Sequence, residues 1–306
     1  MQWGQIKTLF ILSFLILDIY LIMQFIDKQD QENMGILEQE ESTIEQRLED
    51  ENISIPDLPN EAENESFITV SPKIFTEDEI QIIEKLKDQE TAIVNNFIVS
   101  ILKKPINISD KSIEDIETIV KSLIVFPDQY AFWDWNEELN VLIFFQQKHD
   151  RPVFFNQNGV VLVFLNEDEE ITFYTQTVLG DATARQDKKQ LITPIKAIET
   201  LYNTNELYPG DTITNVDIGF HTRVPLANGV QVFVPTWKVT IDDERDYFVN
   251  AIEGWIFSSN DINFLTETIK HDIERLQTID DDVSIKSIAH TLLKEKLASM
   301  NQGGDQ

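Results

Sequence analysis

The hydrophobic pattern of the chain begins with an apolar run over 9–26 that contains one charged residue, Asp18, and no Gly or Pro. A helix needs about twenty apolar residues to cross a bilayer, so the run predicts a transmembrane anchor behind a cytoplasmic N-terminus over 1–8. No small-x-small cleavage site follows the run, which favours an uncleaved anchor over a secretory signal peptide. Lys7 precedes the run, so the positive-inside rule is consistent with an extracytoplasmic location for the bulk of the chain.

Polar residues within the run form two groups on the predicted helix. At about 100° per residue, Ser13, Tyr20 and Gln24 share one stripe, and Asp18 lies on the opposite side. A carboxyl group at bilayer depth is costly and usually faces a protein partner, although snorkelling or local thinning of the bilayer can also accommodate it. We therefore expect these four side chains to contact neighbouring membrane helices.

After the run the chain is polar up to about residue 66, and from about residue 67 its apolar residues recur at the spacing of helices and strands. Residues 27–66 are dominated by acidic and amide side chains, which predicts an acidic stalk that is disordered or loosely helical. A first α+β domain is predicted over 67–180. Its helices start at a capping box over 76–79 and at an amphipathic run over 112–123. Its strands are predicted over 130–135, 141–147, 152–155, 160–165 and 171–178, with Asn-Gly at 158–159 marking a hairpin turn.

The following residues repeat this order of helix and strands. A second α+β domain over 181–258 is predicted to hold a helix that begins at Pro194, then strands over 212–222, 230–241 and 247–257. The C-terminal tail over 259–306 contains two amphipathic stripes, which more often pack on their own protein than on a partner. The predicted fold is therefore α+β, with two similar domains that each contain an antiparallel sheet and a packed helix.

Composition narrows the possible partners and chemistry. The chain has 306 residues with 24 basic and 54 acidic side chains, a net charge of −30, so neither nucleic acid nor an anionic lipid surface is an expected partner. It contains no cysteine, which excludes disulfides, thiol catalysis and thiolate metal sites. With 42% hydrophobic residues, the chain is able to build a core without covalent cross-links.

Several segments, taken together, resemble a known family. The segments are Met1-Gln2-Trp3 through Asp18-Ile19, Ala197-Ile198-Glu199-Thr200-Leu201-Tyr202, Gly219-Phe220, Val234-Pro235-Thr236-Trp237-Lys238-Val239, and Tyr247-Phe248-Val249-Asn250-Ala251 before Gly254. Their order, spacing and position behind an anchor resemble the YycI family, membrane-anchored regulators of an essential cell-wall sensor kinase in low-GC Gram-positive bacteria. The tail after Asp261 extends beyond the resemblance.

The resemblance implies a single-pass membrane protein with an extracytoplasmic α+β body of two similar domains. It also implies pairing with a sister protein, YycH, and contact with the sensor histidine kinase YycG (also called WalK), largely between transmembrane helices. It implies no catalytic residue and no cofactor. The residues of the resemblance that we expect to be structural are Pro235, Trp237, Tyr247, Asn250 and Gly254. Their pattern fits two strands of one hairpin, with Asn250 hydrogen-bonded to the backbone of a turn.

Common catalytic and metal-binding patterns are missing from the sequence. The histidines His149, His221, His271 and His290 show no HExxH or HxH spacing, and the chain contains no GxSxG, Walker A or dinucleotide-binding glycine motif. Adjacent acidic residues are expected by chance among 54 carboxylates and are interpreted as solvated turns. The sequence therefore predicts no catalytic, cofactor-binding or metal-binding residue and no enzymatic activity.

Three functions remain open from the sequence. The leading hypothesis is a signalling accessory that acts through its membrane helix. The second is an extracytoplasmic module that binds a wall fragment or peptide in a pocket between the sheets, lined by aromatics such as Trp133 and Trp135. The third and weakest is a wall hydrolase, which requires two carboxylates about 5–9 Å apart. The sequence does not decide between activation and inhibition of a kinase.

Overall fold

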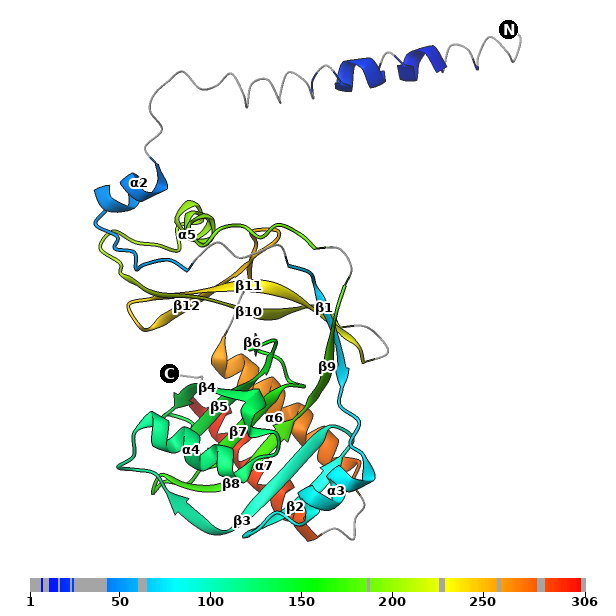
Figure 1. Ribbon diagram of the computed structural model, residues 1–306, viewed down its shortest axis with the longest axis vertical. Helices are drawn as coiled ribbons and strands as arrows, with labels where there is room; N and C mark the ends of the chain where they lie inside the picture. Colours follow the sequence, from blue (N-terminus) through cyan, green and yellow to red (C-terminus); the bar gives the residue numbers. More distant parts are fainter. Residues whose placement is uncertain are drawn as a thin grey trace. The chain divides into compact units, whose positions relative to one another are not determined.

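The computed structural model describes residues 7, 11–15, 17–22, 24, 43–59, 65–185, 188–225, 229–257, 260–279 and 284–303. The chain divides into two units, Met1–Asp50 and Glu51–Gln306. In the first unit, the described residues between 7 and 24 are helical and α2 spans Ile44–Asp50 (Figure 1). No helix among the described residues meets both the length and the hydropathy that a membrane crossing requires. The predicted anchor lies partly outside the described residues, as do residues 27–42 and 60–64 of the predicted stalk.

The second unit is a mixed α+β fold with a large, mostly antiparallel sheet and helices at its C-terminal end (Figure 1). Its strands are β1 Ile68–Pro72, β2 Gln89–Val94, β3 Phe97–Asn107, β4 Tyr130–Asn136, β5 Val141–Lys148, β6 Arg151–Phe154, β7 Val160–Leu165, β8 Glu170–Thr177, β9 Leu179–Ala184, β10 Ile213–Pro225, β11 Gln231–Ile241, β12 Arg245–Asn250 and β13 Ile256–Phe257. Its helices are α3 Glu77–Glu84, α4 Ile113–Leu123, the 3₁₀ turn η1 Pro127–Gln129, α5 Pro194–Asn203, α6 Asp261–Gln277 and α7 Ser284–Gly303.

Local sequence signals account for the helix starts. Thr76 and Glu79 form the predicted capping box, in which the Glu79 N–H donates to Thr76 Oγ1 at 3.3 Å and the Thr76 N–H donates to Glu79 Oε2 at 2.9 Å. Ser112 caps α4 by accepting the backbone N–H of Asp115. Pro194 occupies the first turn of α5, where its missing N–H has no intrahelical acceptor. The predicted starts of these three helices are confirmed.

The strands follow the path β13-β12-β11-β10-β6-β5-β7-β8-β3-β2, and β1 pairs with both β11 and β9. The pairing of β10 with β6 is parallel and brings Phe220 opposite Val153. Gly219 makes this approach possible, because a Cβ there would lie 2.3 Å from the Phe154 ring and 2.6 Å from the Pro152 carbonyl oxygen. Strands from both predicted domain ranges therefore belong to one connected sheet, and the division into two similar domains stays a prediction.

Two sequence expectations need correction. The strand expected over 247–257 is interrupted by a turn between β12 and β13, because Asn250 folds its side chain onto the backbone of that turn. The acidic stalk expected over 27–66 ends earlier, since Ser54 donates its N–H to the Asp211 carbonyl at 3.1 Å and accepts the N–H of Ile213 at 2.9 Å. Residues 51–59 are therefore part of the folded body.

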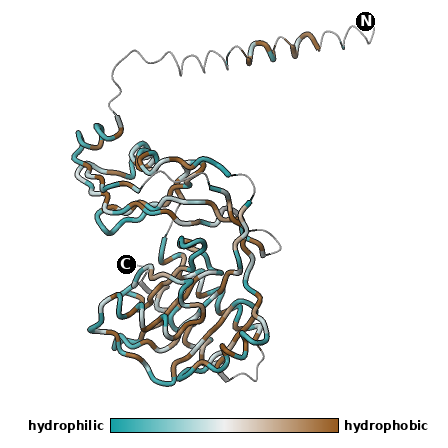
Figure 2. Tube along the Cα trace, in the orientation of Figure 1, coloured by the Kyte–Doolittle hydropathy of each residue, from teal (hydrophilic) through white to brown (hydrophobic). Residues whose placement is uncertain are grey.

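The two C-terminal helices lie beside the sheet (Figure 1) and pack on it, as their amphipathic stripes predict, and hydrophobic and hydrophilic positions intermix along the trace of the body (Figure 2). The buried residues that α6 and α7 contribute to the main core cluster are Phe264, Leu265, Ile269, Ile273, Leu276, Ile285, Ala289, Leu293 and Met300. Polar contacts fix both helices. Arg275 on α6 donates to Asn158 Oδ1 at 2.8 Å and pairs with the buried Asp272 at 2.9 Å. Lys296 on α7 donates to the carbonyls of Leu139 and Leu165, each at 3.0 Å.

This packing predicts a large stability effect at one position of α6 and almost none at another. Leu265 is fully buried, so Leu265→Ala is expected to lower the free energy of unfolding by about 2–5 kcal/mol through lost contacts and a residual cavity. Ile262 lies on the same helix with 47% of its surface exposed, so Ile262→Ala is expected to change it by less than about 0.5 kcal/mol. Urea denaturation of the full chain measures both. Equal effects would contradict the docking of α6.

Candidate functional site

A cavity of about 340 Å³ opens between β4, β5 and β6 on one side and β10 and β11 on the other. The residues that line it are Ala131, Phe132, Trp133, Phe145, Asp150, Pro152, Phe154, Asp217, Ile218 and Lys238. Its volume falls within the range of small-ligand sites, which is about 300–1,000 Å³. Its walls combine aromatic rings with two carboxylates and one ammonium group.

Trp133 lines this cavity, and Trp135 does not belong to its wall. Residues two apart on a strand normally share a face. A register shift between Phe132 and Asp134 breaks this alternation, so Trp133 packs with the core cluster that contains α6, and Trp135 packs with the cluster beneath α4. The indole N–H of Trp135 is buried and makes no hydrogen bond among the described residues. Of the two tryptophans expected to line an aromatic pocket, Trp133 therefore lines this cavity and Trp135 does not.

Lys238 connects the aromatic wall to an acidic cluster. Its Nζ lies 4.3 Å from the centroid of the Trp133 ring and 3.1 Å from Asp246 Oδ2. The pKa of Asp261, the first residue of α6, is raised to about 6, mainly by burial and then by the negative charges of Asp134 and Asp246, partly offset by Lys238. Carboxylates from β4, β12 and α6 are thus gathered around a single ammonium group.

The family-like hairpin makes bonds to the segment before α5 and within its own turn. The Trp237 indole donates to the Ile192 carbonyl at 2.9 Å, and Trp237 is almost completely buried. Asn250 Oδ1 accepts the N–H groups of the two residues that follow Ala251, at 2.9 and 3.0 Å, which is the expected bond to a turn backbone. Gly254 has φ +71°, a conformation that side chains strain, and its N–H donates to the Asn250 carbonyl at 2.8 Å.

Main-chain bonds complete this arrangement. The Pro235 carbonyl accepts the Ala251 N–H at 2.9 Å, and the Ala251 carbonyl accepts the N–H of Ile192 at 2.7 Å. Tyr247 lies on the same hairpin, and burial followed by the charge of Glu206 raises its pKa. Pro235, Trp237, Asn250 and Gly254 thus take part in hydrogen bonds of this hairpin and of the segment before α5.

The polar residues predicted to meet membrane partners all fall within the described helical part of the first unit. Gln24 Nε2 donates to the Tyr20 hydroxyl at 3.3 Å, which places these two side chains on one stripe. Ser13 and Asp18 are exposed. Large apolar side chains surround them, with exposed fractions from 47% for Leu17 to 67% for Ile11.

The histidines lie in four different settings. His221 stacks on Phe257 with ring centroids 4.2 Å apart, and burial lowers its pKa. His271 lies 3.4 Å from Glu274 on α6, His149 is at the β5–β6 turn, and His290 is on α7. Among the described residues, no three His, Asp or Glu side chains are grouped so that they could hold a metal ion.

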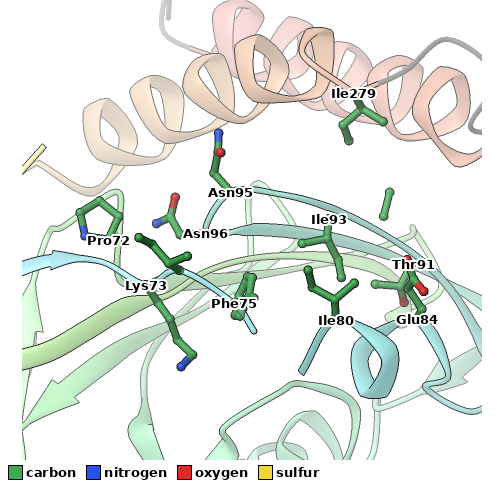
Figure 3. Close-up of a pocket in the computed structure, with 12 residues that line it drawn as sticks. Pro72, Lys73, Phe75, Ile80, Glu84, Thr91, Ile93, Asn95, Asn96 and Ile279 are labelled. Atoms are coloured by element: carbon green, nitrogen blue, oxygen red, sulfur yellow. The ribbon is translucent and has the colours of Figure 1, made fainter. Parts of the chain in front are cut away.

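A second cavity, of about 460 Å³, lies beside α3 and β2 (Figure 3). Its wall includes Phe75, Ile80 and Ile93, with Ile279, which follows α6, on the other side. No pattern in the sequence indicates this site, because apolar and polar residues do not alternate regularly along β2.

Asp261 provides a pH test of the acidic cluster. Its pKa rises from 3.8 to about 6 on folding, so the native state binds the proton more tightly than the unfolded state between these values. The free energy of unfolding is therefore expected to fall as pH rises from about 4 to about 6, by about 1 kcal/mol after allowance for solvent screening. Asp261→Asn is expected to remove this part of the pH dependence in urea titrations. Asp243→Asn, in an exposed turn, is the matched control and is expected to keep it.

The match to known proteins covers most of the body. The family model described as YycI protein matches residues 31–252, well over half of the chain. The match stops before α6 and α7, and it begins after the apolar run at the N-terminus. Among curated proteins, none matches the chain. YycI is a family of regulatory accessory proteins associated with the YycG kinase and not a family of enzymes. The chain belongs to the YycI family.

Proposed function

We propose that this chain is a single-pass membrane accessory protein that modulates an essential cell-wall sensor kinase together with a YycH-like sister protein. In this proposal residues 9–26 form the anchor, the N-terminus is cytoplasmic and the body is extracytoplasmic. Family membership supports the link to the kinase. The observation that carries the membrane part is the apolar surface of the N-terminal helix, whose large side chains are about half exposed or more. Lipid or other apolar helices would cover such a surface.

The two polar faces of this helix suggest two neighbours. Tyr20 and Gln24 form a hydrogen-bonded pair on the stripe that also holds Ser13. Asp18 lies on the opposite side, where a partner that donates hydrogen bonds would satisfy it. A helix that binds one conformation of the kinase more tightly than the other shifts the kinase toward that conformation by the difference in binding free energy.

The proposal predicts which proteins co-purify with the chain from membranes. The native chain is expected to capture the kinase and the sister protein, and a chain with an unrelated apolar span over 9–26 is expected to capture neither, because the specific helix contacts are lost. Asp18→Leu is expected to weaken capture of one of the two partners about tenfold, in line with about 1–2 kcal/mol for a polar contact between membrane helices. Quantitative mass spectrometry of the captured material measures both effects.

Ile19→Leu is the matched control, since it keeps an apolar side chain on the neighbouring position. This variant should capture the kinase and the sister protein as the native chain does, and expression of the kinase's target genes should be unchanged. Equal capture by the native and unrelated spans would contradict a role for helix contacts. Unchanged capture by Asp18→Leu at normal protein level would remove Asp18 from the mechanism.

A second candidate function is an extracytoplasmic ligand-binding module. The cavity between β4 and β11 supports it, because Trp133 offers a ring face beside the ammonium of Lys238 and the carboxylates of Asp150 and Asp217. Sugars and short peptides of the cell wall carry both apolar faces and charged groups, which such a wall could bind.

A direct titration tests this candidate. A muramyl dipeptide, which combines an amino sugar with a charged peptide, is expected to bind the full chain and to change its tryptophan fluorescence. Asp217→Asn is expected to weaken binding about tenfold if the carboxylate contacts the ligand, as for a hydrogen bond to a charged group. Asp243→Asn, outside the cavity, should bind as the native chain does. Binding that is absent, or equally affected by both variants, would exclude this cavity.

A further inference from the structure

Strand β2 is the terminal strand of the sheet path and pairs only with β3 among the described strands. Lys103 beyond this ladder donates its backbone N–H to the carbonyl of Asp88 at 2.9 Å. Because antiparallel hydrogen bonds involve every second residue, the even-numbered residues of β2 bond to β3. The backbone N–H and C=O groups of Thr91 and Ile93 therefore point away from β3.

These outward backbone groups border the cavity shown in Figure 3. Thr91, Ala92 and Ile93 all line it, and within the described part of the chain no backbone group pairs with Thr91 or Ile93 on that side. Successive residues of a strand point to opposite faces. A cavity that touches three successive residues therefore lies along the edge of β2 and not over one of its faces.

The cavity has an apolar wall on each face of the strand. Phe75 and Ile80 belong to the cluster that includes Ile93, on the side of α3. Ile279 belongs to the cluster that includes Ala92, on the side of α6 and α7. A strand added beside β2 would direct one side chain toward Phe75 and Ile80 and the next toward Ile279.

Strand β2 has little of the protection that usually keeps an edge strand from pairing, since its one charged side chain, Glu90, lies near its start and not beside the cavity. Its register with β3 is continuous, and residues 91–94 contain no charged side chain and no proline. By contrast, β4 carries a register shift and the charge of Asp134, and β13 is only two residues long.

We infer that β2 accepts an extended peptide segment of a partner protein by β-strand addition. A peptide backbone supplies donors and acceptors at the spacing of Thr91 and Ile93, whereas an apolar small molecule would leave those groups without hydrogen bonds. The segment carries uncharged residues, with apolar side chains alternating toward Phe75 and Ile279. This surface uses none of the residues assigned to the kinase or to the Trp133 cavity.

The test uses the full chain in lipid nanodiscs and a phage-displayed library of linear peptides. Selection is expected to enrich peptides with alternating apolar residues and no proline at the centre. An enriched peptide, made synthetically, is expected to slow the fast hydrogen exchange of the segment 89–94 about tenfold or more. Thr91→Pro removes one outward N–H without removing a bond to β3, so it is expected to weaken peptide binding about tenfold. Thr91→Val keeps the N–H and should bind within about twofold of the native chain.

Four outcomes would overturn the inference. These are enrichment of no peptide, protection of a segment other than 89–94, equal weakening by the two Thr91 variants, and self-association of the free chain through β2. The last outcome would replace the partner peptide by a second copy. If Thr91→Pro does not fold, the exchange measurement on the unaltered chain decides between the outcomes.

Discussion

The packing of one aromatic cluster holds the large sheet and the C-terminal helices together. Trp133 on β4 lies with its ring centroid 5.6 Å from Phe154 at the end of β6 and 6.0 Å from Phe248 on β12, and Phe155 contacts both Phe248 and Phe264 of α6. These rings come from segments far apart in the sequence. Each buried ring removes a large apolar area from water and adds specific edge and stacking contacts. A chain without cysteine depends on such packing for its stability.

The same packing explains where the polar groups of the body are found. Lys238 reaches Trp133 at the border of the cluster, and the carboxylates of Asp134, Asp246 and Asp261 gather near it. Burial raises the pKa of Asp261, and the nearby negative charges, only partly compensated, add to this rise, which makes the border sensitive to pH. The cavity lined by Trp133 and the aromatic core are therefore parts of one structure, so a ligand bound there would also stabilise the fold.

Family membership and the described fold assign different roles to different segments. The matched residues 31–252 contain most of the sheet, in which Trp237 bonds to the segment before α5 and Asn250 bonds to the turn after β12. Helices α6 and α7 lie outside the match and complete the core from the other end of the chain. The body of this chain thus draws part of its stability from a C-terminal segment that lies outside the family match.

The sequence by itself determined the local elements. The capping box of Thr76 and Glu79, the bounds of β7 and the inward stripes of α6 and α7 follow from residues within a few positions of one another, so periodicity and capping signals were enough to predict them. Strand β3 was not predicted, because Ser100 interrupts its apolar start and Lys103, Lys104 and Pro105 follow, so it shows neither alternation nor an unbroken apolar run. Only the tertiary structure decided that β6 meets β10 at Gly219, that the strand shift in β4 separates Trp133 from Trp135, and that the edge of β2 borders a cavity. These features depend on which distant strands pair, and pairing is selected by the packing of the whole chain.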